Sequence, residues 1–186
     1  MEGLIKFGIP ILSAVLGVLF RYLYGIWADR RKFKQELKDN NFIDVTATDW
    51  HAAWQTSVDN VEIINTERLI MVQKGNVVKV KNVEKSPENP KGGYLWEAQM
   101  QFFQGRYMMG WYFPLVAENN TSKGIMFFAY HSPKKMFYGK WVGASYDGDL
   151  SNGFLVISKD RTSSLVELTK LISIHKNRVN IIFNQT

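Results

Sequence analysis

Beyond residue 38, apolar and polar side chains alternate with a period of two, and this alternation constrains the fold more than any other feature. The clearest example is residues 94–103, in which one face carries Tyr94, Trp96, Ala98, Met100 and Phe102. Successive side chains of a strand point to opposite faces, so this pattern indicates a strand with one buried and one largely solvated face. Strands of this kind are typical of antiparallel sheets.

Several such segments follow one another with short, turn-rich connections, including a hairpin expected around Gly75 and Asn76. The expected strands cover residues 67–73, 76–84, 94–103, 106–114, 122–131, 136–146 and 154–159. Many short strands without long helices between them indicate an antiparallel sandwich or barrel. We therefore expect a mainly β fold: a small antiparallel β-barrel of about eight strands with one or two short helices.

Two segments depart from the period of two. Residues 47–56 suggest a short helix that packs Trp50 and Trp54. Residues 163–176 place four apolar side chains at helical spacing, which favours a helix against or inside one end of the barrel. The β-branched content of the second segment leaves a strand open. A last strand is expected over residues 178–183.

The N-terminal segment predicts a membrane anchor. Residues 7–20 form 14 consecutive positions without a charge, and continuing to Trp27 extends the segment to 21, close to the ~20 apolar residues that a spanning helix needs. The long Arg21 side chain can reach the headgroups, and Tyr22 and Tyr24 suit the interface. The alternative is a buried helix of a soluble domain, since Arg21 interrupts the run.

The residues after the apolar segment predict its orientation. Arg30, Arg31, Lys32, Lys34 and Lys38 form a basic cluster, which favours the cytoplasmic face. The weakly basic start and the missing cleavage site argue against a signal peptide. We expect an anchor over residues 1–28, a basic juxtamembrane linker over 29–41 and a cytosolic ligand-sensing barrel over 42–186. The protein would cross the membrane once, with its N-terminus outside.

Composition narrows the possible partners. The sequence has no cysteine, which excludes disulfides and cysteine-type zinc sites. Its net charge is +6, but residues 42–186 hold 16 Lys and Arg against 13 Asp and Glu. This mild basicity argues against duplex nucleic acid, which needs a concentrated basic face. A small anionic ligand is compatible with this mild positive charge.

Catalytic motifs are missing from the sequence. His51, His131 and His175 lie in separate elements without metal-binding spacing, and no phosphate-binding glycine loop or nucleophile elbow occurs. We therefore expect neither an enzyme nor a metal or other cofactor.

Aromatic and basic side chains intermingle in the expected barrel, a mixture that suits a nucleotide because bases stack on rings and phosphates pair with Arg or Lys. Small barrels also fill their interiors with rings for packing alone. The candidates for base contacts are Tyr107, Trp111, Tyr138 and Trp141. The candidates for phosphate contacts are Arg106, Lys140 and Arg161. By alternation, Tyr138 and Trp141 lie on opposite faces, so at most one of them lines the interior.

The run of residues 137–161 carries Gly139-x-Trp141-x-Gly143, Asp147-Gly148 and Ile157-Ser158-Lys159 behind an N-terminal membrane segment. This arrangement resembles the transmembrane β-barrel effectors of bacterial CBASS anti-phage defence, described as two-transmembrane, β-strand-rich proteins associated with cyclic-nucleotide synthases. The resemblance implies a barrel that senses a cyclic di- or oligonucleotide, self-association in the inner membrane, and membrane disruption that stops the infected cell. In a related arrangement the nucleotide has the opposite effect: it restrains the effector while bound, and its loss releases the effector. This sequence departs from that family in offering one membrane segment.

A single helix cannot form a pore, so disruption would require several anchors in a homo-oligomer. Ser13 and Gly17 have the small-xxx-small spacing that allows close helix approach, and a ring of Arg21 side chains would line a wet defect. The alternative function is a non-toxic, membrane-anchored scaffold whose barrel binds a lipid or a protein partner.

Overall fold

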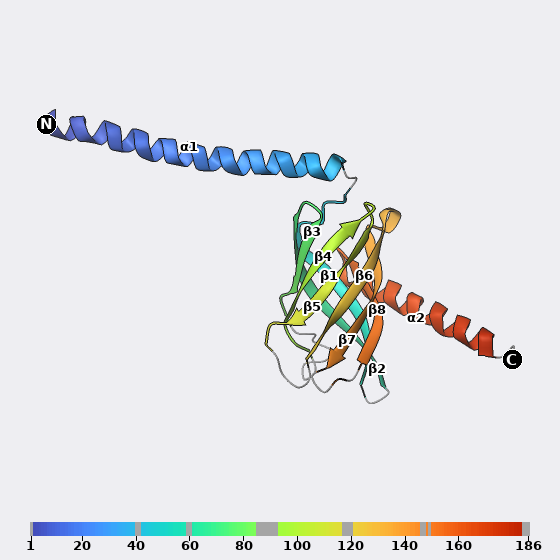
Figure 1. Ribbon diagram of the computed structural model, residues 1–186. Coiled ribbons are helices and arrows are strands. Elements are labelled where there is room, and N and C mark those ends of the chain that lie inside the picture. Colours follow the sequence, from blue (N-terminus) through green and yellow to red (C-terminus); the bar gives the residue numbers. More distant parts are fainter. Residues whose placement is uncertain are drawn as a thin grey trace. The chain divides into compact units, whose positions relative to one another are not determined.

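The computed structural model describes residues 2–39, 42–58, 61–84, 93–116, 121–145, 148 and 150–183. The chain divides into two compact units, Met1–Asn40 and Asn41–Thr186. The first unit is the helix α1, Glu2–Asp39 (Figure 1). The second unit contains all the strands and the C-terminal helix.

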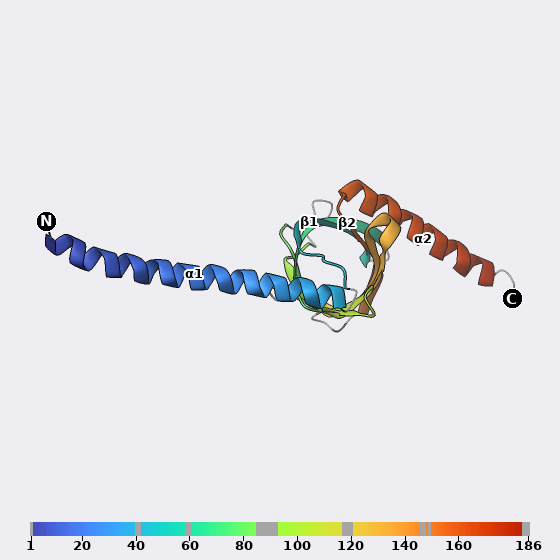
Figure 2. The same ribbon diagram turned by 90° about the horizontal axis from the view of Figure 1, so that it is seen from above.

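The second unit is a closed eight-stranded antiparallel barrel, as the sequence predicts. Each strand pairs with the next along the chain, and β1 pairs with β8 to close the ring, which Figure 2 shows end on. The strands are β1 Ala47–Val58, β2 Val61–Lys74, β3 Val77–Asn82, β4 Trp96–Phe103, β5 Tyr107–Pro114, β6 Ser122–His131, β7 Met136–Ser145 and β8 Leu150–Ser158. A short 3-10 helix, Ser132–Lys134, joins β6 to β7. The β2–β3 turn uses Gly75 at a φ of 60°, a left-handed conformation that costs glycine little.

Alternation along the strands determines what fills the barrel. In β4, Trp96, Ala98, Met100 and Phe102 are buried, and the residues between them are more exposed. This confirms the assignment of that segment from the sequence. The other strands contribute further buried side chains to the same core, including Leu69, Met71, Met108, Phe128 and Phe137.

One end of the barrel is filled by the segment that leads into β1. The ring of Phe42 stacks on Phe102 at 5.9 Å between centroids. The backbone N–H of Val45 donates to Gln73 Oε1 at 3.0 Å, and Trp50 Nε1 donates to the carbonyl oxygen of Val45 at 2.8 Å. These bonds satisfy polar groups that would otherwise be buried unpaired. The apolar core therefore extends to this end, which we call the plugged end.

The helix α2, Arg161–Phe183, lies against the outside of the barrel (Figure 2). Leu168 and Ile172 pack on Ala53 of β1 and Val156 of β8. The helix expected over residues 163–176 is confirmed within this longer element. The strand expected over 178–183 is wrong, because α2 continues to Phe183.

The short helix expected over residues 47–56 is also wrong. This segment belongs to β1, whose backbone pairs with both β2 and β8. The helix was expected because Thr48 or Asp49 could cap it ahead of Trp50 and Trp54. The same two residues also fit one face of a strand, and burial inside the barrel decides between the two arrangements.

Residues 2–39, which include most of the expected anchor and linker, form one continuous helix, α1. From Val15 to Trp27 its apolar side chains are exposed, Phe20 to 73% and Val18 to 72%. Within the described residues, no helix combines the length and the apolarity that crossing a membrane requires. The anchor over residues 1–28 stays a prediction. The side chain of Ser13, one of its proposed contact residues, lies outside the described part.

Candidate ligand site inside the barrel

Four of the seven residues expected to bind a ligand point away from the barrel interior. Trp111 is 55% exposed on the outer face of β5. Tyr107 lies on the same outer face, where its ring stacks on Phe127 at 5.9 Å between centroids. Lys140 lies over the ring of Phe154, its Nζ 4.5 Å from the ring centroid. Tyr138 also faces outward, toward α2.

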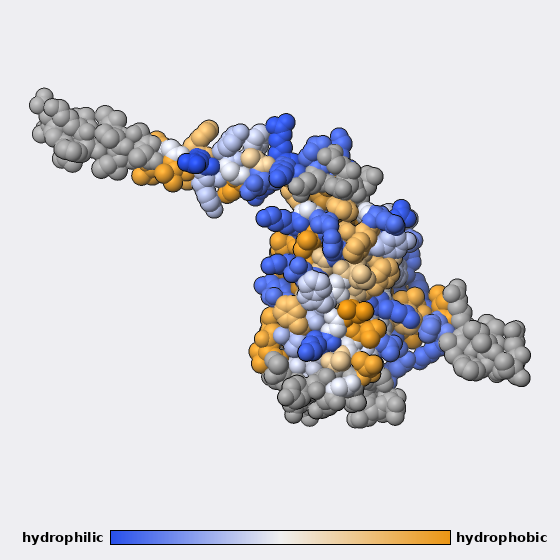
Figure 3. Space-filling model, in the orientation of Figure 1, coloured by the Kyte–Doolittle hydropathy of each residue, from blue (hydrophilic) through white to orange (hydrophobic). Residues whose placement is uncertain are grey.

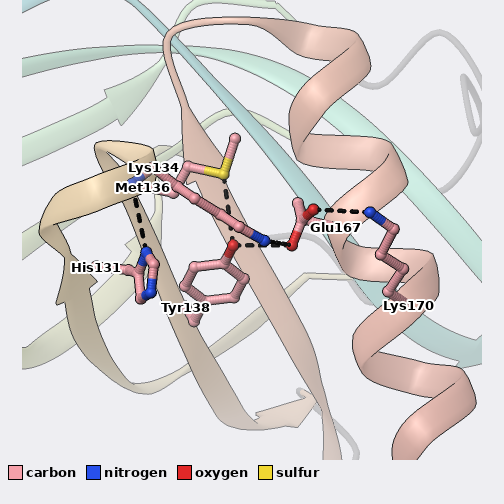
Figure 4. A network of polar contacts seen from close by, with 6 residues as sticks. All are labelled: His131, Lys134, Met136, Tyr138, Glu167 and Lys170. Atoms are coloured by element: carbon pink, nitrogen blue, oxygen red, sulfur yellow. Dashed lines mark hydrogen bonds and ion pairs between the residues drawn. The ribbon is translucent and has the colours of Figure 1, made fainter.

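Tyr138 belongs to a structural network between β7 and α2 (Figure 4). Its hydroxyl donates to Glu167 Oε2 at 2.9 Å, and Lys134 and Lys170 pair with the same carboxylate at 2.7 and 3.0 Å. The hydrogen bonds from these two lysines lower the pKa of Glu167 to about 2. The network holds α2 against the barrel wall, and the Tyr138 hydroxyl already uses its proton in the hydrogen bond to Glu167.

The two arginines also lie outside the barrel interior. Arg106 is exposed in the β4–β5 turn, and its carbonyl oxygen accepts a hydrogen bond from the backbone N–H of Tyr130 at 2.8 Å. Arg161 begins α2 and donates to the hydroxyl of Thr66. The expected set therefore does not converge inside the barrel, where only Trp141 remains.

Trp141 instead belongs to a set of rings at the end of the barrel opposite the plugged end. Trp54 and Trp141 meet edge to face at 5.9 Å and 87°. Trp141 meets Tyr112 at 6.4 Å and 84°, and Tyr112 meets Trp96 at 6.4 Å and 70°. We call these four side chains the tryptophan end. Edge-to-face contacts between neighbouring rings are favourable and hold the rings in fixed orientations.

A buried carboxylate lies among these rings. Glu67, on the inner face of β2, is 2% exposed, and its Oε2 accepts a hydrogen bond from Trp96 Nε1 at 2.9 Å. Asn82 holds the adjoining chain: its Oδ1 accepts from the backbone N–H of Trp96 at 2.7 Å, and its Nδ2 donates to the carbonyl oxygen of Tyr94 at 2.9 Å. These bonds fix Trp96, and through it one oxygen of Glu67.

Several polar atoms next to this carboxylate have no hydrogen-bond partner. They are Trp54 Nε1, Asn65 Nδ2, Asn65 Oδ1 and Glu67 Oε1. Asn65 is fully buried. Trp54 Nε1 still lies close enough to Glu67 to lower the pKa of its carboxyl group, so the Asn65 amide is the group left without a partner. An unpaired buried polar group costs about 1–3 kcal/mol, so a buried amide with neither its nitrogen nor its oxygen paired is exceptional within a folded core. The pattern is typical of a site that a polar ligand or ordered water completes.

Burial raises the pKa of Glu67 to about 7. The loss of water around the carboxylate is the main cause, and the N–H groups of Trp96, Asn82 and Trp54 offset part of it. Glu67 therefore changes protonation near neutral pH. A buried carboxyl group whose pKa lies near neutrality is a marker of functional sites.

Hydroxyl groups line the neighbouring wall. Ser122 Oγ lies 3.0 Å from the hydroxyl of Tyr112 and 2.9 Å from that of Tyr94. Burial raises the pKa of Tyr112 to about 12, so this hydroxyl stays protonated at physiological pH. Among the described residues, no three His, Cys, Asp or Glu side chains come together as a metal site.

Sequence reasoning missed Glu67 and Asn65. The signal was present, because Asn65 and Glu67 fall on the same strand face as Leu69 and Met71, and a polar residue in the buried register of a strand is informative. The unpaired state of their atoms was not readable from sequence, since it depends on the closed ring of strands.

Comparisons with known proteins assign the chain to no family. No protein-family model matches the chain, and no curated protein matches it. Five chains of solved structures match, among them a redesigned β-barrel with 12% sequence identity and a TM-score of 0.41, over 60% of this chain and 89% of that one.

Proposed function

We propose that this chain is a membrane-anchored anti-phage effector whose barrel senses a cyclic di- or oligonucleotide and controls oligomerisation and disruption of the inner membrane. The nucleotide base would enter the tryptophan end of the barrel, in place of the outward-facing residues expected from the sequence. The wider role in defence follows the resemblance to the CBASS effectors.

The observation that carries the sensing proposal is the buried, unpaired amide of Asn65, which lies opposite Trp54 and two positions from Glu67. Rings surround these residues, and Trp54 itself is only partly buried, so solvent reaches its ring. A planar heterocycle with hydrogen-bonding edges matches such surroundings, because its faces stack on rings and its edge pairs with buried polar groups.

The exposed apolar stretch of α1 supports the anchor. The side chains from Val15 to Trp27 are mostly more than half exposed, and the interruptions are Gly17, Arg21 and Gly25. Apolar surface on this scale marks a site of membrane or protein contact. Gly17 has no heavy atom within 4 Å of its would-be side chain, so a second helix can approach there.

Sensing requires that the nucleotide bind one assembly state better than the other, since a ligand shifts an equilibrium only by its differential affinity. Substitution of Arg21 by leucine should then preserve membrane insertion and nucleotide binding and weaken toxicity. Unchanged toxicity of that variant would remove Arg21 from the mechanism.

Binding of the full chain in detergent micelles to a panel of radiolabelled cyclic di- and trinucleotides tests the sensing proposal. We expect base-selective binding at low micromolar protein. A folded chain that binds none of the panel would contradict the proposal.

A second candidate is a non-toxic, membrane-anchored scaffold for a protein or lipid partner, and the outer wall of β5 and β6 favours it. This outer β5–β6 face comprises Tyr107, Met109, Trp111, Phe113, Ile125 and Phe127, each at least 36% exposed. Figure 3 shows apolar side chains gathering on the barrel wall among polar ones. Partner binding that is lost on Trp111→Ser, with no response to any cyclic nucleotide, would favour the scaffold.

A further inference from the structure

The helix α1 carries an apolar seam with the spacing of a coiled coil. Alternating steps of four and three residues, which we call the α1 seam, lead from Leu12 to Leu16, Leu19, Leu23, Ile26, Arg30 and Phe33. All these residues except Arg30 are apolar. Shifting the pattern by one residue in either direction leads only to charged side chains after Trp27. An apolar repeat of this spacing over three heptads is typical of a coiled coil.

The α1 seam lies on one unbroken helix and faces solvent. The helix runs from Glu2 to Asp39 (Figure 1). Leu16, Leu19 and Leu23 are each more than half exposed. In the seven-residue repeat of a coiled coil, written a to g, positions a and d form the stripe that packs against a partner helix. A strict seven-residue repeat also keeps this stripe on the partner as the helices wind into a left-handed supercoil. The stripe is therefore available to another helix.

The charges beside the α1 seam fit a second copy of the same helix in parallel. With Leu16 and Leu23 at position a, Asp29 falls at position g and Lys34 at position e of the next heptad. Neighbouring helices of a coiled coil pair charges at g with charges at e. Residues five apart on one helix do not face each other, so Asp29 is placed to pair with Lys34 of another copy. An antiparallel partner would instead put this charged end beside the apolar end.

The side chains in and beside the α1 seam favour more than two helices. A two-stranded coiled coil prefers β-branched residues at position a, whereas leucine at a with isoleucine at d shifts the preference to three or four strands. Here leucine occupies a, and Leu19 and Ile26 occupy d. The flanking positions are apolar as well: Phe20 and Trp27 at e and Tyr22 at g are each more than half exposed. This wider apolar surface suits a helix that touches two neighbours.

We propose that copies of this chain assemble through the α1 seam into a parallel bundle of three or four helices. The inference rests on the proposed function, because it names the surface through which the effector self-associates. Gly17 falls at position b and Arg21 at position f, so both lie on a different face of the helix. Arg30, the one polar residue in the seam, would fix the register of the helices. Left-handed packing of this kind occurs in soluble coiled coils and in most membrane bundles.

Single cysteines test which face of α1 meets another copy. The chain has no cysteine of its own, so each introduced cysteine reports one position. The variants Leu16→Cys and Leu19→Cys probe the seam, and Gly17→Cys, Val18→Cys and Arg21→Cys are the matched controls. The full chain is oxidised in liposomes of phosphatidylethanolamine and phosphatidylglycerol, with and without the cyclic nucleotide panel. Identical positions approach closely only across a parallel seam, so we expect the seam variants to form roughly tenfold more disulfide-linked dimer than the controls.

The double substitution Leu19→Ala and Leu23→Ala then measures how much the seam contributes. In sedimentation velocity of the full chain in detergent micelles, it should raise the protein concentration at half assembly at least about tenfold. Val18→Ala, next to the seam, should leave this concentration unchanged. Cross-linking that is even around the helix, or strongest at Gly17→Cys, would overturn the inference and leave the effector standing. A chain that stays monomeric with and without nucleotide, its seam covered by lipid alone, would overturn the proposed oligomerisation as well.

Discussion

The substitution Glu67→Gln should make folding stability less dependent on pH and raise it above neutrality. Burial raises the pKa of Glu67 from 4.5 to about 7 in the folded protein. Between these values the folded state binds a proton that the unfolded state has lost, so the free energy of unfolding falls as pH rises through this window. Glutamine keeps the shape and has no charge to bury.

The size of the effect follows from the same pKa values. A rise of about 2.5 in pKa corresponds to about 3 kcal/mol. We expect Glu67→Gln to match the unmodified protein within about 1 kcal/mol at pH 5 and to exceed it by about 3 kcal/mol at pH 8, by this linkage.

Urea unfolding followed by tryptophan fluorescence at both pH values measures this difference, with Glu97→Gln as the control. Glu67 would not be the source of the pH dependence if Glu67→Gln kept the pH dependence of the unmodified protein, or if the variant were the less stable of the two at pH 8. Either result would mean that the Glu67 carboxylate contacts water or a partner other than Trp96 Nε1.

Three further predictions concern the barrel wall. Glu167→Gln should lower the free energy of unfolding by about 1 kcal/mol at pH 7, a value limited by solvent screening. Because lysine contacts lower the pKa of Glu167 to about 2, thermal melts should show this loss disappearing as pH falls from 4.5 towards 2. Gly153→Ala should destabilise the barrel by about 1–3 kcal/mol or more in urea, because the added carbon would lie 2.0 Å from the backbone oxygen of Gln55; full stability would show that β1 and β8 separate easily. Trp111→Ser should change the unfolding free energy by less than about 1 kcal/mol, since its ring is 55% exposed; a large loss would show that the outer β5–β6 face is packed.

The sequence predicted the closed barrel well because strand alternation is a local pattern with a direct physical cause. Residues 94–103 could be assigned from their side chains alone, and the inner face of β4 is buried as expected. The hairpin at Gly75 was equally readable. These features depend on neighbours in the sequence.

The errors arose where tertiary contacts decide between patterns. Residues 47–56 fit a helix and a strand, and pairing with β2 and β8 selects the strand. Residues 178–183 carry β-branched side chains but continue α2. In the first case strand pairing overrides the local helix propensity. In the second case a helix that has already formed extends through residues that would otherwise favour a strand.

The candidate site was the least predictable part. Aromatic and basic residues were grouped by composition, but alternation sends Tyr107, Trp111 and Tyr138 to the outer wall. Trp141 alone reaches the interior. The decisive residue is Glu67, an acid in a buried register, and its importance appears only when the ring closes around it.

A ligand site inside the barrel can be tested by the indole N–H signals in a ¹⁵N-tryptophan NMR spectrum of the full chain, recorded with and without the cyclic nucleotide of the panel that binds most tightly. The chain has six tryptophans, which single substitutions can assign. We expect the Trp54 signal to shift most, with a smaller change at Trp96 and none at Trp111. A shift confined to Trp111, or no shift at saturating nucleotide, would contradict a ligand site inside the barrel.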